Sequence, residues 1–174
     1  ASVAENTTAV MTVTATDADQ PAQTLSFSIA GGADAAKFTI NASTGALSFI
    51  SAPDFESPTD AGGDNVYDVI VEVADGRGST DSQAIAVTVT SANDNAPVIT
   101  SGSTASVAEN TTAVMTVTAT DADQPAQTLS YSIIGGVDAA KFAINSSTGA
   151  LSFLAAPDFE TPTDAGGDNV YDVT

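Results

Sequence analysis

The chain has 174 residues, of which 22 are acidic and three are basic, and its formal net charge is −19. A charge of this sign and size repels nucleic acid and anionic membrane surfaces, so neither is expected as a partner. The sequence has no cysteine, no histidine and no apolar run of about 18 residues, which excludes disulfides, imidazole or thiolate metal sites, histidine-dependent hydrolases and a membrane-spanning helix.

Apolar and polar residues alternate with a period of two through residues 1–100, and this pattern predicts short, half-buried β-strands. A short edge strand is expected around Val3, and a single helical turn at Asp34–Phe38. The other expected strands cover Met11–Ala15, Leu25–Ile29, Phe38–Ile40, Leu47–Phe49, Tyr67–Val73 and Ile85–Val89. Seven short strands joined by turns rich in glycine, proline and aspartate favour an all-β, immunoglobulin-like sandwich.

The pattern then repeats. The stretch Ala-Ser-Val-Ala-Glu-Asn-Thr-Thr begins at Ala1 and again at Ala105, and residues 105–174 differ from residues 1–70 at only nine positions. Repetition at this length indicates tandem domains that each close a core, rather than a solenoid. We expect a first domain at 1–100, with a short linker at 91–104 that Pro97 keeps extended, and a second domain at 105–174.

The second repeat stops inside the counterpart of the sixth strand, at Thr174. Missing strands leave the inner faces of both sheets and the strand edges open, and open edges pair with other chains. We therefore expect the second repeat, where it is ordered, to be completed by another copy, through strand swapping or edge-to-edge packing.

Acidic and amide side chains gather at the ends of the expected strands and in the linker. They are Glu5, Asp17, Asp19, Asp54, Glu56, Asp75, Asn93, Asp94 and Asn95. In Asp17-Ala-Asp19 and Asp54-Phe-Glu56, both carboxylates project from one side of an extended chain, which is unfavourable unless a cation bridges them. Oxygen ligands without nitrogen or sulfur select hard ions, so Ca²⁺ is expected ahead of Mg²⁺.

Each of these pairs also has a simpler interpretation, a solvated carboxylate in a turn, and only the ordered set favours calcium. Paired carboxylates can also act as acid and nucleophile in glycoside hydrolysis. No tryptophan or aromatic cluster accompanies them, and they recur in both repeats. We therefore expect no enzymatic activity.

In these segments the chain resembles tandem cadherin repeats, particularly the cadherin-like repeats of large bacterial surface adhesins. The matching segments are Val3–Asn6, Val13–Asp19, Leu25–Ile29, Phe38–Ile40, Thr44–Leu47, Asp54–Glu56, Tyr67–Asp75 and Asn93–Pro97. The resemblance implies a cadherin-type Greek-key sandwich with calcium at the junction between repeats. By position, the implied ligands are Glu5, Asp54, Glu56, Asp94, Asn95, the backbone carbonyls of Ala92 and Asn93, and Asp121 and Asp123 of the second repeat.

One departure from the family pattern concerns Ser91, which stands where the linker motif usually opens with aspartate. We expect two well-coordinated calcium ions at the junction and a third, weaker one near Asn95, Asp121 and Asp123. By the same resemblance, two further sets of ligands belong to junctions with other repeats, and we expect no tight calcium there. These sets are Asp17, Asp19 and Asp75, and Glu109, Asp158 and Glu160.

The resemblance implies a calcium-binding, extracellular adhesion or spacer module, in which ions at the linker rigidify a tandem array on a secreted or membrane-associated bacterial surface protein. The alternative is that each repeat is itself a carbohydrate-binding or homophilic adhesive domain. Calcium ions and neighbouring repeats are then the expected partners, and cell-surface glycans or identical repeats are further candidates. The scarcity of aromatic residues counts against glycans, and a homophilic contact that inserts a tryptophan is excluded because the chain has none.

Overall fold

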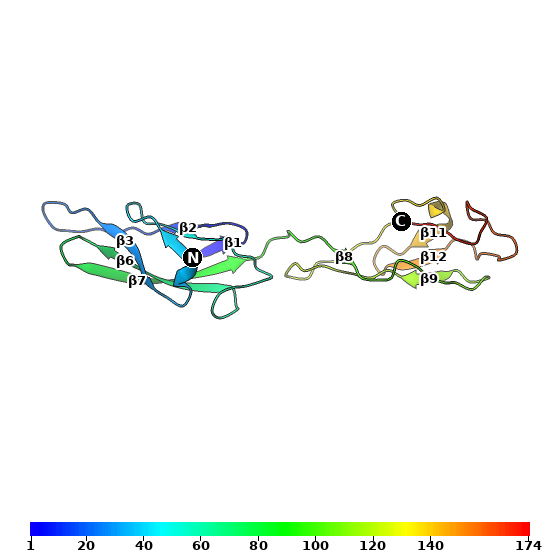
Figure 1. The fold of residues 1–174 in the computed structure, drawn as a ribbon, viewed down its shortest axis with the longest axis horizontal. Coiled ribbons are helices and arrows are strands. Elements are labelled where there is room, and N and C mark those ends of the chain that lie inside the picture. Colours follow the sequence, from blue (N-terminus) through cyan, green and yellow to red (C-terminus); the bar gives the residue numbers. More distant parts are fainter. The chain divides into compact units, whose positions relative to one another are not determined.

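The computed structural model describes all of residues 1–174 and divides into two compact units (Figure 1). The first unit consists of Ala1–Asp94 together with Asp123–Pro125, and the second consists of Asn95–Ala122 with Ala126–Thr174. The division between Asp94 and Asn95 falls inside the segment 91–104 that the sequence marks as a linker. The helical elements are two 3₁₀ turns, and the fold offers no helix of the length and apolarity that crossing a bilayer requires.

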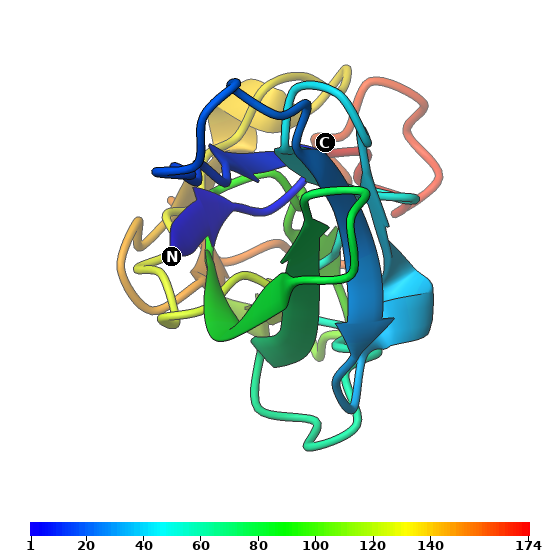
Figure 2. The same ribbon diagram turned by 90° about the vertical axis from the view of Figure 1, so that its left-hand side faces the viewer.

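The first unit is built from seven strands in two sheets. The four-stranded sheet has the order β1 (Ser2–Ala4), β7 (Thr80–Thr90), β6 (Val66–Ala74), β3 (Ser26–Gly31). The three-stranded sheet has the order β2 (Ala9–Thr12), β5 (Ala46–Phe49), β4 (Phe38–Ile40). β1 runs parallel to β7, whereas the other neighbours are antiparallel, and Figure 2 shows β6 lying between β7 and β3. The predicted all-β sandwich is confirmed, and the predicted helical turn forms η1 (Ala35–Lys37).

The core of the first unit follows the predicted alternation along the strands. The inward-facing residues of the two longest strands are Tyr67, Val69 and Val71 on β6 and Ile85, Val87 and Val89 on β7. Phe38 and Phe49 of the other sheet stack with ring centroids 4.5 Å apart, and Tyr67 meets Phe49 edge-on at 5.1 Å. β2 ends at Thr12, before the expected Ala15, because Thr12 pairs with Ala46, the first residue of β5, and the next N–H, that of Val13, donates to Gly45 in the turn.

Gly45 lies in the turn between β4 and β5, where the backbone passes close to Val13. Its φ is +70°, and a Cβ built there lies 2.1 Å from the carbonyl oxygen of Val13. We expect Gly45→Ala to lower the free energy of unfolding by more than about 2 kcal/mol, because a left-handed backbone costs alanine roughly 1–2 kcal/mol and the clash adds to that cost.

The matched control is Gly63→Ala. Its φ is +67°, but a Cβ there meets nothing within 4 Å, so only the conformational cost remains. Urea unfolding of both variants in calcium-free buffer compares the two effects. Equal losses of stability would show that the approach of Val13 to Gly45 is unimportant.

Two buried aspartates, Asp34 and Asp60, brace the loops of the first unit. Asp34 accepts hydrogen bonds from the backbone N–H groups of Ala61 at 2.7 Å and Asp68 at 2.9 Å. Asp138 makes the same pair of bonds in the second unit. The carboxylates of Asp34 and Asp138 are structural, because backbone N–H groups from distant segments donate to their oxygens.

Asp60 caps the loop before β6 and gives the stability of the first unit a dependence on pH. Its carboxylate accepts N–H bonds from Asp64 at 3.0 Å and Asn65 at 3.1 Å. Burial alone raises the pKa of Asp60, but the backbone hydrogen bonds lower it by more, so that its pKa lies below the ordinary 3.8. A carboxylate whose pKa is depressed by folding stabilises the fold above its unfolded-state pKa, and this contribution is lost as the pH falls through the folded-state pKa.

We expect Asp60→Asn to be less stable than the wild type at neutral pH. The difference should shrink below about pH 4, where this carboxylate is protonated in the unfolded wild type, and should be lost as the pH falls through the lower pKa of the folded state. Urea unfolding in chelator across this pH range checks the prediction. A deficit that stays constant down to pH 2.5 would show that the charge of Asp60 does not contribute.

The second unit contains fewer strands, although its sequence nearly repeats that of the first. β8 (Val98–Ile99) pairs with β10 (Ala119–Thr120). A three-stranded sheet has the order β11 (Phe142–Ile144), β12 (Ala150–Phe153), β9 (Ala113–Thr116), and η2 (Ala139–Lys141) directly precedes β11 in the chain. Phe142, Leu151 and Phe153 form its core.

Residues 129–133 and 170–174 repeat the alternating patterns of β3 and of the start of β6, but they form no strand, so the strands that repetition of the pattern predicts there are not observed. Single backbone bonds still join this part of the chain, since Thr174 N–H donates to Gly135 and Ile134 N–H donates to Thr174, both at 2.7 Å. In the first unit β3 pairs with β6, and β6 is held on its other side by β7. Residues 170–174 have no strand on that side, so the alternating pattern is not extended into a ladder.

Candidate metal centre

Glu5 follows directly after β1 and is almost fully buried, with 3% of its surface exposed. Its Oε1 accepts a hydrogen bond from the backbone N–H of Ala92 at 2.6 Å, and its Oε2 accepts one from Phe55 at 2.7 Å. One carboxylate therefore joins the end of β1 to the loop after β5 and to the segment after β7. Each carboxylate oxygen has a second lone pair with which it can accept a further partner.

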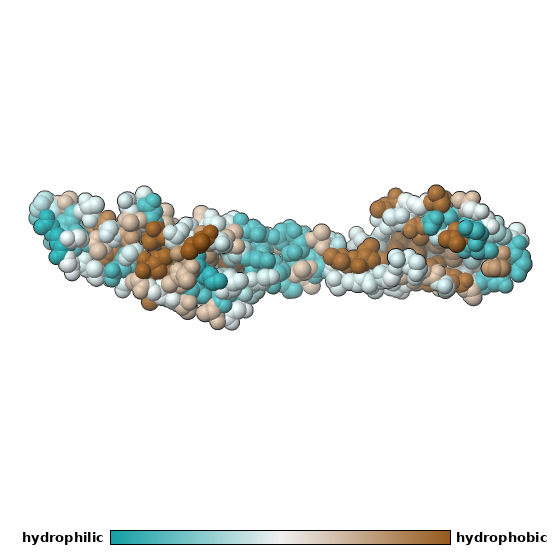
Figure 3. Space-filling model, viewed as in Figure 1, coloured by the Kyte–Doolittle hydropathy of each residue, from teal (hydrophilic) through white to brown (hydrophobic).

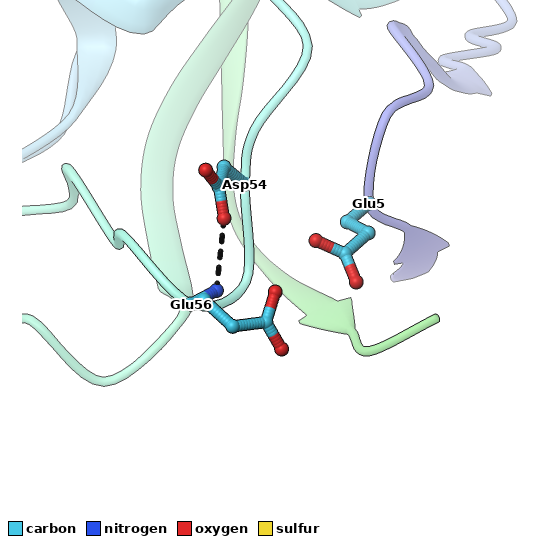
Figure 4. A group of neighbouring side chains, drawn as sticks. All are labelled: Glu5, Asp54 and Glu56. Atoms are coloured by element: carbon cyan, nitrogen blue, oxygen red, sulfur yellow. Dashed lines mark hydrogen bonds between the residues drawn. The ribbon is translucent and has the colours of Figure 1, made fainter. Parts of the chain in front are cut away.

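Asp54 and Glu56 lie in the loop after β5, beside Glu5 (Figure 4). Asp54 Oδ1 accepts the backbone N–H groups of Glu56 at 3.0 Å and Ser57 at 3.2 Å, a local turn that fixes the loop. Figure 4 shows the carboxyl groups of Glu5 and Glu56 turned toward one another. One carboxylate oxygen from each of Glu5, Asp54 and Glu56 lies within 4.8 Å of the others.

Glu56 also belongs to a second group, with Asp94 and Asp123, whose carboxylate oxygens lie within the same 4.8 Å limit. Asp123–Pro125 fold with the first unit, and Asp123 is 1% exposed. The N–H of Asp94 donates to Asp123 Oδ1 at 3.4 Å, and the N–H of Gln124 donates to Glu56 Oε1 at 3.1 Å. Two carboxylate triads thus share one side chain, and the hydrophilic surface at this end of the first unit is visible in Figure 3.

The electrostatic environment of Glu56 is unfavourable without a cation. Burial raises the pKa of its carboxyl group above the ordinary 4.5, and the carboxylates of Glu5 and Asp94 raise it further, against hydrogen bonds from the N–H groups of Gln124 and of Glu56 itself. Glu56 Oε2 is buried and has no hydrogen-bond partner. A polar oxygen that is buried and left without a partner is unfavourable.

These features fit a hard cation such as calcium. Five carboxylates approach one another from separate segments, and all their ligand atoms are oxygens. Ca²⁺ takes about six to eight oxygens from carboxylates, carbonyls and water, and its charge would offset the repulsion at Glu56. A carboxylate oxygen that binds a cation has no hydrogen-bond donor at that position, and Glu56 Oε2 is a buried oxygen of this kind.

The structure brings together five of the residues that the sequence implies as ligands: Glu5, Asp54, Glu56, Asp94 and Asp123. Ala92 takes part through its N–H, which donates to Glu5, and its neighbour Asn93 is exposed in the same segment. Asn95 and Asp121 belong to the second unit.

No sequence signal assigned a role to Asn6. Its Nδ2 donates to Asp94 Oδ2, and its own N–H donates to Pro53 at 2.9 Å. Asn6 has a φ of +59°, a left-handed conformation that asparagine adopts more readily than most residues. The sequence signal that could have indicated this role is the position of Asn6 between Glu5 and two threonines. Asn6 orients the side chain of Asp94 and fixes the turn that follows Glu5.

The acidic sets assigned to other junctions are arranged differently. Glu109, Asp158 and Glu160 repeat the first triad in the second unit, with ligand atoms within 4.8 Å, but all three side chains are exposed. At the opposite end of the first unit, Asp75 accepts N–H bonds from Arg77 at 2.7 Å and from Ser79 at 3.1 Å, and these bonds lower its pKa.

Asp17 and Asp19 lie in the loop after β2. Asp17 Oδ1 accepts the N–H of Asp19 at 2.8 Å, and Asp19 Oδ2 accepts a hydrogen bond from Gln23 at 3.3 Å. The carboxylate groups found within 4.8 Å of one another include neither of them. These two aspartates therefore stay a predicted half-site.

The Cadherin domain family model matches residues 1–90 and 103–173. The chain is 33% identical over 144 residues to human Protocadherin Fat 1, and this match covers 79% of this chain and 3% of that protein. It is 34% identical over 176 residues to Cadherin-2 of Bos taurus, and this match covers 88% of this chain and 19% of that protein. The crystal structure of mouse Cadherin-23 EC22-24 superposes with a TM-score of 0.67 at 25% identity, over 91% of this chain and 51% of that chain.

The chain therefore spans only a small part of the curated relatives it matches. These relatives are animal proteins, so the bacterial origin expected from the sequence stays a prediction.

Proposed function

Because this chain belongs to the cadherin domain family, whose domains are extracellular adhesion modules and not enzymes, we propose that it is a calcium-binding adhesion or spacer module. Calcium at the segment between its repeats stiffens a tandem array on the surface of the cell that carries it. The parent is a bacterial surface protein, and the repeats serve to space or present a binding domain.

The observation that carries this proposal is the position of Glu56. Its carboxylate belongs to both triads, and its buried Oε2 has no hydrogen-bond donor. Two calcium ions that share Glu56 would supply the missing positive charge. Glu5 and Asp54 complete one ligand set, and Asp94 and Asp123 complete the other. The carbonyls of Ala92 and Asn93, and the side chains of Asn95 and Asp121, add the remaining oxygens and a weaker third position.

The stiffening follows from where these ligands lie in the chain. Asp94 closes the last segment of the first repeat, and Asp123 comes from the sequence of the second repeat yet folds with the first unit. Without a cation, the carboxylates of Glu56, Asp94 and Asp123 repel one another, which favours release of Asp123. With calcium bound, movement of the second repeat would break coordination bonds. Extracellular modules bind calcium at roughly 10⁻⁴–10⁻³ M, which suits fluids outside cells.

A distance measurement between two spin labels tests this function. The chain has no cysteine, so Ser43→Cys and Ser147→Cys place unique labels on exposed, equivalent turns of the two repeats. We expect a broad distance distribution in chelator and a narrow one in millimolar calcium. Distributions of equal width under both conditions, with calcium binding verified by calorimetry, would overturn the stiffening role.

The variant Asp123→Asn tests whether the stiffening depends on the triad of Glu56, Asp94 and Asp123 and not on calcium bound elsewhere. We expect this variant to lose the narrowing and about one calcium per chain, because it removes a carboxylate from only one of the two triads. The matched control is Asp19→Asn, the equivalent position of the first repeat, which lies outside both triads. Asp19→Asn is expected to keep the wild-type narrowing and stoichiometry.

A further inference from the structure

Phe55 lies between two residues of the first triad, Asp54 and Glu56, and its backbone is held on both sides. Its N–H donates to Glu5 Oε2 at 2.7 Å, and its carbonyl oxygen accepts a hydrogen bond from Asn65 Nδ2 at 3.0 Å. Glu5 is itself a member of the triad, whereas Asn65 lies ten residues further along the chain. Asn65 therefore contacts the loop of the metal centre from outside the carboxylate cluster.

The peptide group that joins Phe55 to Glu56 transmits this contact to the carboxylates. A peptide group is planar, so the direction of its carbonyl also fixes the direction of its N–H. The carbonyl of this peptide points to Asn65, and its N–H donates to Asp54 Oδ1 at 3.0 Å. The bond from Asn65 thus orients the N–H that holds the carboxylate of Asp54, and also the backbone from which the side chain of Glu56 projects.

Asn65 is fixed well enough to act as a brace. It is 8% exposed, and its φ is +63°. Its N–H donates to Asp60 Oδ1 at 3.1 Å, and its carbonyl oxygen accepts a hydrogen bond from Val89 of β7 at 2.9 Å. The amide that reaches Phe55 therefore starts from a backbone that is tied to the capped loop and to the larger sheet.

The other atom of the amide shows that stability does not account for this side chain. Asn65 Oδ1 is buried and has no hydrogen-bond partner, which is unfavourable. Glycine adopts a left-handed backbone more readily than asparagine and would bury no unpaired oxygen there. What asparagine adds at this position is the N–H group that it donates to Phe55.

The same bonds form beside the second carboxylate triad. Asn169 Nδ2 donates to the carbonyl of Phe159 at 3.1 Å, and the N–H of Phe159 donates to Glu109 Oε2 at 3.1 Å. The next peptide N–H, that of Glu160, donates to Asp158 Oδ1 at 3.1 Å. The amide brace therefore accompanies the carboxylate triad in both units.

We propose that Asn65 is a positioning residue of the metal centre, which orients the peptide between Phe55 and Glu56 and so places the carboxylates of Asp54 and Glu56 for a cation. This role rests on the proposed calcium binding. Asn65 acts through its amide nitrogen, which donates to the loop and is not a ligand. Groups that orient metal ligands change the metal affinity by about 10–100-fold when they are removed.

Asn65→Gly on the whole chain tests the proposal. It removes the donor, and glycine adopts the same φ without strain. We expect calorimetry to give a calcium Kd for the first unit raised about tenfold or more, with unchanged stoichiometry. In chelator, we expect the amide hydrogens of Phe55 and Glu56 to exchange faster than in the wild type, since the loop has lost its brace.

The matched control is Gly63→Ala, in the same loop as Asn65. Its φ is +67° and a Cβ there meets nothing within 4 Å, so the substitution strains the backbone and leaves the bond to Phe55 in place. We expect this variant to lose stability and to keep the wild-type calcium Kd. Circular dichroism in chelator shows whether each variant is folded.

Asn169→Gly repeats the exchange measurement in the second unit, so the test does not depend on the folding of one variant. We expect faster exchange at Phe159 and Glu160, with Phe55 and Glu56 unchanged. Unchanged exchange at Phe159 and Glu160 would show that the amide does not hold the loop.

Two results overturn the positioning role while calcium binding stands. They are a wild-type calcium Kd for Asn65→Gly, and an equal loss of affinity for Asn65→Gly and Gly63→Ala, which would mean that general destabilisation is responsible. A wild-type chain that binds no calcium overturns the proposed function instead. In that case the exchange at Phe55 and Glu56 in chelator decides alone whether Asn65 holds the loop.

Discussion

Glu56→Gln is expected to remove most of the stabilisation that calcium gives to the first unit. Binding to the folded state alone stabilises by about 2.7 kcal/mol for each site when the free ion is at 100 times its Kd. Glu56 belongs to both triads, so one substitution weakens both sites. In chelator we expect the variant to be at least as stable as the wild type, because the neutral amide no longer repels Glu5 and Asp94.

Urea unfolding with and without calcium measures this effect, and the matched control is Glu160→Gln. Glu160 occupies the same place in the second unit, in a triad whose members are all exposed. We expect Glu160→Gln to keep the full calcium-dependent gain. If the two variants lose the same amount, the stabilising ions lie outside the Glu56 cluster.

Truncation of a core leucine is expected to have very different costs in the two repeats. Leu47→Ala removes a side chain that is 2% exposed and enclosed by both sheets, and we expect a loss of about 3–5 kcal/mol. Leu151→Ala removes the equivalent side chain beside an open groove. Leu151 is 9% exposed and belongs to a smaller buried cluster, so fewer contacts are lost and we expect about 2 kcal/mol or less.

Hydrogen exchange under native conditions resolves these losses unit by unit, since protection at β5 reports on the first unit and protection at β12 on the second. Both leucines stand in the same local sequence, Gly-Ala-Leu-Ser-Phe, so local propensity cancels in the comparison. Equal losses would mean that the second core is closed in solution.

The two repeats show how far a local pattern determines structure. Ser-Val-Ala forms β1 at Ser2–Ala4 and no strand at 106–108, although the residues around both are identical. The difference is β7, which pairs with β1 through a register that joins Val3 to Val89. Alternation predicts which residues can face a core, and therefore predicted the first unit well. Whether such a segment becomes a strand depends on a neighbour distant in sequence, which alternation does not report.

The same distinction applies to the candidate site, where local sequence predicted some of the residues and not others. Glu5, Asp54 and Glu56 were predictable because carboxylates at strand ends, two residues apart, suggest a shared cation. The position of Asp123 within the first unit and the contact from Asn6 to Asp94 depend on how separate segments fold together. The buried Asp34 and Asp60 carry the same type of side chain but brace loops, and only their backbone partners distinguish them from ligands.

The bonds that Glu5 makes to the backbone determine how quickly the site can act. Because Ala92 and Phe55 donate to its two oxygens, Glu5 and the loop after β5 are held by the fold itself and do not require an ion to take their places. Under the proposed function, removal of calcium restores the repulsion between the carboxylates around Glu56 but leaves this loop in place. We therefore expect calcium to rebind at Glu5 without a slow refolding of this loop. An array of such repeats would lose its stiffness soon after the calcium concentration falls and would regain it as quickly when calcium returns.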